Sequence, residues 1–123
     1  MNEITRDALK GLIDSKQTIG EISQVLLIDV REPIEIQGYG SIPTSINIPM
    51  GSVDKELSLI PEAFKQKYGK TISRDKKIIF YCRSGNRSES TTKIAFDKGY
   101  VNATNYKGSA LEWADIDVNV KKY

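Results

Sequence analysis

The sequence contains no histidine, and this absence narrows the chemistry that its 123 residues can perform. Without an imidazole, Ser/His/Asp and Cys/His catalysis and histidine-ligated metal sites are excluded. Cys82 is the single cysteine, which excludes an internal disulfide, a CxxC redox pair and a zinc knuckle. We therefore expect no metal and no cofactor, and any chemistry at Cys82 has to proceed without a second thiol.

Strong charge of one sign and long hydrophobic runs are also absent. The 18 Lys and Arg residues against 16 Asp and Glu residues give a net charge of +2, with no dense basic stripe of the kind that binds nucleic acid. No segment approaches the roughly 18 apolar residues of a membrane span, and acidic residues interrupt the opening segment, unlike a signal or transit peptide. We expect a soluble cytoplasmic protein without a membrane partner, or a mitochondrial one if a targeting segment has been trimmed.

The distribution of apolar residues predicts an α/β fold. Apolar or β-branched runs predict strands at residues 25–30, 45–48, 77–81 and 103–106. Helical spacing and end signals predict helices at residues 6–16, 61–68, 87–98 and 109–114, and a short one near 31–35 that the glycines at 38 and 40 should end. Alternating strands and helices favour a mainly parallel central sheet with helices on both faces, and the lack of a linker predicts one domain over residues 1–123.

The residues with chemical potential follow two of the predicted strands. Asp29 and Arg31 lie at the end of one strand, and Cys82 lies at the end of another. Ligand sites of open parallel sheets lie beyond the carboxyl ends of the strands, where the following loops meet. We expect Asp29 and Arg31 to form an ion pair or hydrogen-bond network that braces this site structurally.

A tight polar loop after Cys82 predicts an anion-binding cradle. The loop is followed at once by a predicted helix, so its N–H groups and the helix N-terminus should converge on the first side chain of the segment. A thiol placed there should ionise well below its ordinary pKa of about 8.5. The candidate active-site loop comprises Arg83, Ser84, Gly85, Asn86, Arg87 and Ser88.

Four motifs in order make the chain resemble a single-domain rhodanese, a thiosulfate sulfurtransferase. They are Leu27–Pro33 at a strand end, Ser41–Pro49 over the next strand, Cys82–Ser88 as the active-site loop, and Gly108–Trp113 as the closing glycine-to-tryptophan motif. The resemblance covers nearly the whole chain and implies the rhodanese-like three-layer fold.

The resemblance also implies a two-step reaction. Cys82 would take a sulfane sulfur from a small anionic donor such as thiosulfate, or from a thiol persulfide, and hold it as a persulfide. It would then pass the outer sulfur to cyanide, a thiol or a protein acceptor, with no general base if the thiolate is already formed. Arg83 and Arg87 would hold the sulfonate end of thiosulfate.

Three positions, in two of the motifs, depart from the pattern of the family. Thr44 and Ser109 stand where the family often has glycine, and Ser41 stands where it often has histidine. The replacements at Ser41 and Thr44 predict a changed turn at the rim of the pocket.

Two alternatives remain open at this point. A cysteine and arginine loop also suits a phosphatase or an arsenate reductase, although four residues separate Cys82 from Arg87, whereas the phosphatases that resemble this fold have five. One residue fewer removes up to about 3.5 Å of chain and shrinks the ring of N–H groups. The other alternative is a non-enzymatic persulfide carrier or partner-docking module.

Overall fold

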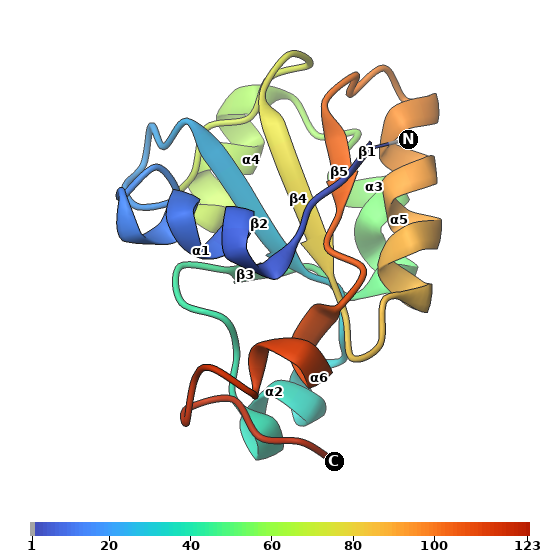
Figure 1. The fold of residues 1–123 in the computed structure, drawn as a ribbon. Coiled ribbons are helices and arrows are strands. Elements are labelled where there is room, and N and C mark those ends of the chain that lie inside the picture. Colours follow the sequence, from blue (N-terminus) through green and yellow to red (C-terminus); the bar gives the residue numbers. More distant parts are fainter. Residues whose placement is uncertain (1) are drawn as a thin grey trace.

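The computed structural model describes residues 2–123 and contains a five-stranded sheet in which all paired strands are parallel (Figure 1). The strand order is β1-β5-β4-β2-β3. The strands are β1 (Asn2–Glu3), β2 (Val25–Asp29), β3 (Ile46–Asn47), β4 (Lys77–Tyr81) and β5 (Ala103–Asn105). The central pair, β2 and β4, runs in register from Val25 beside Lys77 to Asp29 beside Tyr81, so both strands end at the same edge of the sheet.

Helices cover both faces of the sheet, as predicted for an α/β domain. They are α1 (Arg6–Asp14), α2 (Pro33–Tyr39), the 3-10 turn η1 (Met50–Ser52), α3 (Val53–Glu56), α4 (Pro61–Tyr68), α5 (Asn86–Asp97) and α6 (Ser109–Trp113). Residues of α3, α4 and α5 enter one core cluster, and residues of α1 and α6 enter the other. The fold therefore has three layers (Figure 1).

The two central strands lack polar alternation because both of their faces are buried. In β2, Leu26 and Ile28 belong to the core cluster under α4 and α5, whereas Val25 and Leu27 belong to the cluster under α1 and α6. An unbroken apolar run is the pattern of a strand that contributes to two cores.

The ends of the predicted helices are set by local signals. The Thr5 hydroxyl accepts a hydrogen bond from the Ala8 N–H at the start of α1, and Gly69 ends α4 in the left-handed conformation. The short helix α2 runs further than predicted, through Gly38, and ends only at Gly40, where φ is +76°. The strand β1, the turn η1 and the helix α3 were not predicted from the sequence.

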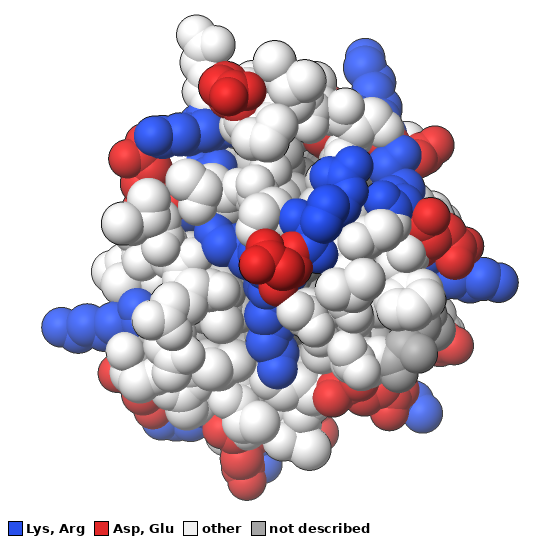
Figure 2. Space-filling view, turned by 90° about the horizontal axis from the view of Figure 1, so that it is seen from above, with Lys and Arg blue, Asp and Glu red and all other residues white. Residues whose placement is uncertain are grey.

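Charges of both signs are interspersed at the end of the sheet where β4 begins. Seen from above, Lys and Arg side chains alternate with Asp and Glu (Figure 2), without a basic stripe. Basic side chains near this end bind main-chain oxygens: Lys76 binds Thr71 and Arg74 binds Lys98. None of the helices in residues 2–123 is long and apolar enough to cross a membrane.

Candidate active site

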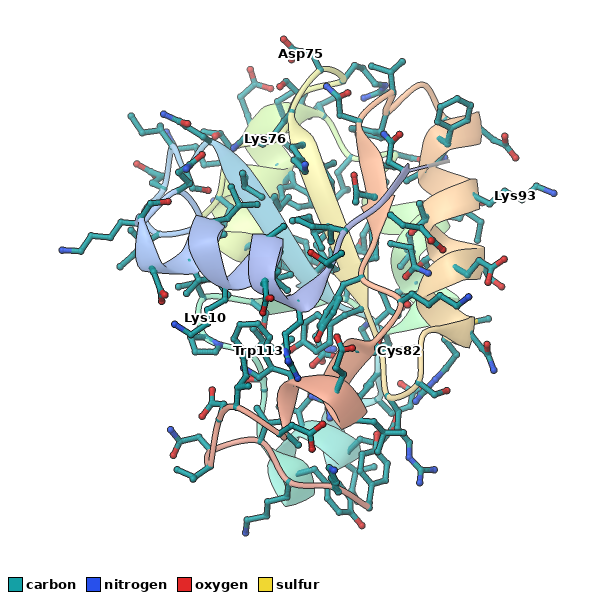
Figure 3. The ribbon with its side chains drawn as sticks, viewed as in Figure 1. Lys10, Asp75, Lys76, Cys82, Lys93 and Trp113 are labelled. Carbon is teal, nitrogen blue, oxygen red and sulfur yellow. The ribbon has the colours of Figure 1, made fainter. Side chains whose placement is uncertain are left out.

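Cys82 follows the last residue of β4, whereas Asp75 and Lys76 precede the first residue, at the other end of the strand (Figure 3). The cysteine is 1% exposed and belongs to a core cluster, so its burial alone would suit an inert packing residue. The atoms around its sulfur are polar, however, and they decide what the thiol can do.

Hydrogen-bond donors of the following loop surround the sulfur of Cys82. We call these donors, which belong to Ser84, Gly85 and Ser88, the cradle. The Gly85 N–H donates to Sγ at 3.1 Å and the Ser88 N–H at 3.4 Å. Ser88 belongs to the first turn of α5, so the positive end of the helix dipole also faces the sulfur. The predicted convergence of loop N–H groups on Cys82 is present.

Gly85 is required by both the conformation and the packing of this loop. Its φ is +97°, in the left-handed region that favours glycine. A Cβ at this position would lie 2.2 Å from the main-chain oxygen of Lys107. The loop can therefore turn its N–H towards the sulfur only with glycine here.

The cradle stabilises the thiolate over the thiol. Burial alone would raise the pKa of Cys82, but hydrogen bonds from the Ser88 hydroxyl and from three loop N–H groups outweigh it and lower that pKa. The three N–H groups belong to Ser84, Gly85 and Ser88. The reactive form of the cysteine is thus favoured without an imidazole.

The Ser88 hydroxyl can serve both protonation states of the sulfur. In the thiol, Cys82 donates to Ser88 Oγ at 3.5 Å, and the hydroxyl donates to the Gly85 oxygen at 3.1 Å. When the thiol proton leaves, the hydroxyl can turn and donate to the sulfur. The Gly85 oxygen keeps a partner in the Glu89 N–H at 3.0 Å, so this turn leaves no buried acceptor unpaired.

Ser109 supports the cysteine from the neighbouring segment. Its hydroxyl accepts the Cys82 N–H at 3.1 Å, donates to the Tyr106 oxygen at 2.8 Å and lies 4.0 Å from the Cys82 sulfur. Ser109 is fully buried and has a φ of +55°. The side chain that replaces a glycine here is thus compatible with the left-handed conformation and gives the cysteine a main-chain partner.

Thr44, at the other position where glycine is frequent, also keeps the left-handed conformation. Its φ is +72°, and its hydroxyl donates to Thr18 Oγ1 at 2.8 Å. Threonine thus adopts the left-handed conformation that favours glycine. The changed turn at the rim of the pocket stays a prediction.

Asp29 and Arg31 form a buried ion pair next to the site. Arg31 Nη2 lies 2.6 Å from Asp29 Oδ2, and Arg31 is fully buried. Burial would lower the pKa of Arg31, but the Asp29 carboxylate raises it above its usual value. Arg31 also donates to the Gly40 oxygen at 2.7 Å, which ties the end of β2 to the end of α2.

Arg87 is held by a carboxylate that sequence reasoning did not identify. Its guanidinium makes two parallel hydrogen bonds to Glu35 of α2, at 2.7 and 2.9 Å. Those hydrogen bonds hold the pKa of Glu35 at about 2, with a further contribution from the Tyr123 hydroxyl. The partners are 52 positions apart in the sequence, which explains why no local pattern revealed the pair.

Arg83 is also engaged, in this case with Tyr123. Its guanidinium lies 4.3 Å from the centre of the Tyr123 ring, and Nη2 donates to the Tyr123 main-chain oxygen at 2.6 Å. The Tyr123 hydroxyl donates to Glu35 Oε1 at 2.7 Å. We call Glu35, Arg83, Arg87 and Tyr123 the arginine rim.

The remaining loop residues have supporting positions. Asn86 begins α5, and both Asn86 and Ser84 are exposed. Trp113, the expected core anchor, is 3% exposed and packs edge-on against Tyr106. In residues 2–123 no group of His, Cys, Asp and Glu side chains is arranged to hold a metal ion.

The fold and the loop match known proteins. The profile of the Rhodanese-like domain matches residues 5–116. The chain belongs to the rhodanese-like family. It is 53% identical over 91 residues to the rhodanese domain-containing protein CG4456 of Drosophila melanogaster, which covers 73% of this chain and 82% of that protein.

Sulfurtransferases are among the other rhodanese-like relatives. A putative mitochondrial thiosulfate sulfurtransferase of Schizosaccharomyces pombe is 45% identical over 103 residues, which is 82% of this chain and 70% of that protein. The human single-domain sulfurtransferase TSTD1 superposes with a TM-score of 0.82 at 28% identity, over 95% of this chain and 98% of that one. The resemblance seen in the four sequence motifs is confirmed.

Proposed function

We propose that this rhodanese-like protein is a thiosulfate sulfurtransferase that carries the transferred sulfur as a persulfide on Cys82. The observation that carries the proposal is the cradle, in which loop N–H groups and the Ser88 hydroxyl converge on the Cys82 sulfur and lower its pKa. The relatives named as thiosulfate sulfurtransferases support sulfur transfer as the activity.

In the first step the Cys82 thiolate attacks the sulfane sulfur of thiosulfate. A bond forms between the two sulfurs while the bond inside the donor breaks, and its electron pair leaves with sulfite. A thiol persulfide reacts in the same way and releases a thiolate. The donors around Cys82 then stabilise the negative charge of the enzyme persulfide.

In the second step a thiolate or cyanide attacks the outer sulfur of the persulfide. The products are a new persulfide or thiocyanate, and the electron pair of the broken bond returns to Cys82 as the thiolate. The cradle that lowers the thiol pKa makes Cys82 a good leaving group here. Neither step needs a general base when the acceptor is already an anion.

Each loop residue has a role in this proposal. Gly85 and Ser88 supply the shortest donors to the sulfur, Ser84 adds a third N–H, and Asn86 starts the helix that aims its N-terminus at the sulfur. Arg83 and Arg87 interact with the anionic end of the donor. Asp29 and Arg31 have a structural role, as a buried ion pair that braces the site.

The phosphatase alternative is not favoured. In this loop the N–H donors approach the Cys82 sulfur itself, at 3.1 and 3.4 Å. Such a small ring of N–H groups is expected when only four residues separate Cys82 from Arg87, instead of the five found in the phosphatases. Relatives named as thiosulfate sulfurtransferases also favour sulfur transfer over phosphate hydrolysis.

The acceptor and the compartment are also part of the proposal. Relatives of Saccharomyces cerevisiae and Homo sapiens are named thiosulfate:glutathione sulfurtransferases, which favours a small thiol as the acceptor. We propose a single rhodanese-like domain over residues 1–123. It would act in a reducing compartment, either the cytoplasm or the mitochondrion, as in the relatives named mitochondrial.

A steady-state assay of thiosulfate with cyanide or glutathione tests the activity. Wild type should transfer sulfur, and Cys82→Ser should fall to the background rate, because the serine hydroxyl is hardly ionised and forms no persulfide. The variant should keep the melting temperature of the wild type within a few degrees. Wild-type protein that released phosphate from aryl phosphates but transferred no sulfur would overturn the proposal.

A further inference from the structure

Tyr123 lies among more positive than negative side chains. Its hydroxyl donates to Glu35. Burial and that carboxylate raise the pKa of Tyr123, against the positive charge of Arg31, which lowers it. Its ring and main-chain oxygen bind Arg83, and Arg87 binds the same carboxylate as the tyrosine. Three guanidinium groups thus surround one phenol and one carboxylate.

Two of these guanidinium groups keep buried N–H donors without a partner. Nη1 of Arg31 and Nε of Arg83 are buried and make no hydrogen bond within the described residues. Arg31 is fully buried, so its Nη1 is shielded from bulk solvent. Buried donors of charged groups without an acceptor are unfavourable, and an anion with several oxygens would satisfy more of them than the single oxygen of a phenol.

The position of Tyr123 is held by contacts that can be exchanged. The ring stacks on Tyr39 with centroids 3.8 Å apart, and the Lys121 N–H just before it donates to the Tyr39 oxygen at 2.8 Å. Tyr123 is only half-buried and lies outside both core clusters. Residues 121–123 can therefore move without opening a core, as long as the buried Val120 stays in place.

We propose that Tyr123 is a specificity-determining residue of the donor site. In the absence of a donor, Tyr123 occupies the guanidinium groups that an anionic donor needs, and it is displaced when that donor binds. The inference rests on the proposed function, because it concerns donor recognition at the same cysteine. A dianion such as thiosulfate or sulfate replaces the phenol and the main-chain oxygen as the partner of Arg83. A donor without a sulfonate group gains less from this exchange.

Removing the tyrosine should strengthen anion binding. In Tyr123→Ala the KM for thiosulfate should fall by about tenfold, the size of one charge-assisted hydrogen bond, while kcat stays close to that of the wild type. Tyr123→Phe breaks only the bond to Glu35 and keeps the ring against Arg83, so its KM should fall by a smaller factor.

The chain offers a matched control at Tyr68. There a tyrosine hydroxyl also donates to a buried carboxylate, Glu56, which a basic residue, Lys67, binds as well. The two hydrogen bonds of this cluster join α3 to α4 and involve no residue of the cradle or of the arginine rim. Tyr68→Phe should leave the KM for thiosulfate unchanged.

Inorganic sulfate separates this inference from the proposed function, because it binds without reacting. Sulfate affinity, measured by NMR titration, should be about tenfold higher for Tyr123→Ala than for the wild type, even in a protein that transferred no sulfur. Unchanged or weaker sulfate binding in Tyr123→Ala would overturn the inference. A rise in the KM for thiosulfate, or a joint fall of kcat and melting temperature, would also overturn it, since either would make Tyr123 a binding or structural residue.

Discussion

The cradle around Cys82 and the arginine rim beside it differ in the chemical groups that they use and in the parts of the chain that supply them. The cradle binds the sulfur with main-chain N–H groups and a buried hydroxyl, and its members contact one another within a short stretch of chain. The rim consists of long side chains from distant segments, and each of its arginines already has a partner. The groups that lower the pKa of the nucleophile are thus part of the fold, whereas we infer that recognition of the donor depends on the exchange of contacts in the rim.

This difference implies that the two tasks can be separated by mutation. Main-chain donors in a buried loop cannot move far, so the pKa of Cys82 should respond to changes in the cradle. The rim should instead control which donors bind and how tightly. The predictions below test this separation, from the largest expected effect to the smallest.

The largest effect, on the stability of the fold, is expected from Ser109, whose hydroxyl accepts the hydrogen bond of the Cys82 N–H. Ser109→Ala should lower the free energy of unfolding by about 2 kcal/mol, because it leaves the buried Cys82 N–H without its acceptor. Ser109→Gly removes the same hydroxyl but relieves the left-handed strain, so it should be less destabilised. Urea unfolding of both variants measures this, and equal stability of Ser109→Ala and wild type would contradict it.

A tenfold effect on reactivity is expected from Ser88. Ser88→Ala removes the hydroxyl that stabilises the thiolate, so the pKa of Cys82 should rise. Alkylation by iodoacetamide below that pKa should slow about tenfold, the size of one hydrogen bond to a charged group. The KM for thiosulfate should change little. The pH dependence of alkylation gives the pKa directly, and an unchanged pKa would remove Ser88 from the cradle.

A smaller effect, confined to the donor, is expected from Arg83. Arg83→Ala should raise the KM for thiosulfate by about fivefold, the upper range for one partly exposed ion pair, with less effect on an uncharged thiol persulfide. The pKa of Cys82 should be the same as in the wild type. Equal losses with both donors would show that the rim does not recognise charge.

The smallest effect is expected from Glu35, because its ion pair with Arg87 is partly exposed and is screened by solvent. Its pKa is about 2 against an ordinary 4.5, so its stabilisation of the folded protein is present above about pH 4.5 and is lost as the pH falls through about 2. The melting temperature of the wild type should therefore fall further than that of Glu35→Gln on acidification over this range. Parallel curves would indicate that the rim is not coupled to folding.

Local sequence signals were sufficient for most of the fold and for the cradle. The apolar run of β4, Gly85 and the start of α5 lie within a few residues of Cys82, so spacing alone predicted the convergence of donors. The strand β1 was missed because its two residues are exposed and show no periodicity. The helix α3 was missed because four residues are too few for a helical pattern.

The arginine rim could not be predicted because its contacts join distant segments. Tyr123 and Glu35 are 88 residues apart, and nothing in the sequence around either residue indicates the other. The interpretation of Arg83 and Arg87 as free anion-binding groups came from the family resemblance. The structure adds that both have partners that a donor must compete with.

The central claim is that Cys82 carries the transferred sulfur, and intact mass spectrometry tests it most directly. After incubation with thiosulfate and removal of the excess donor, the wild-type protein should gain the mass of one sulfur atom and lose it again on addition of cyanide. Cys82→Ser should gain nothing. Wild-type protein that gains no sulfur, or Cys82→Ser protein that gains as much as the wild type, would contradict the account.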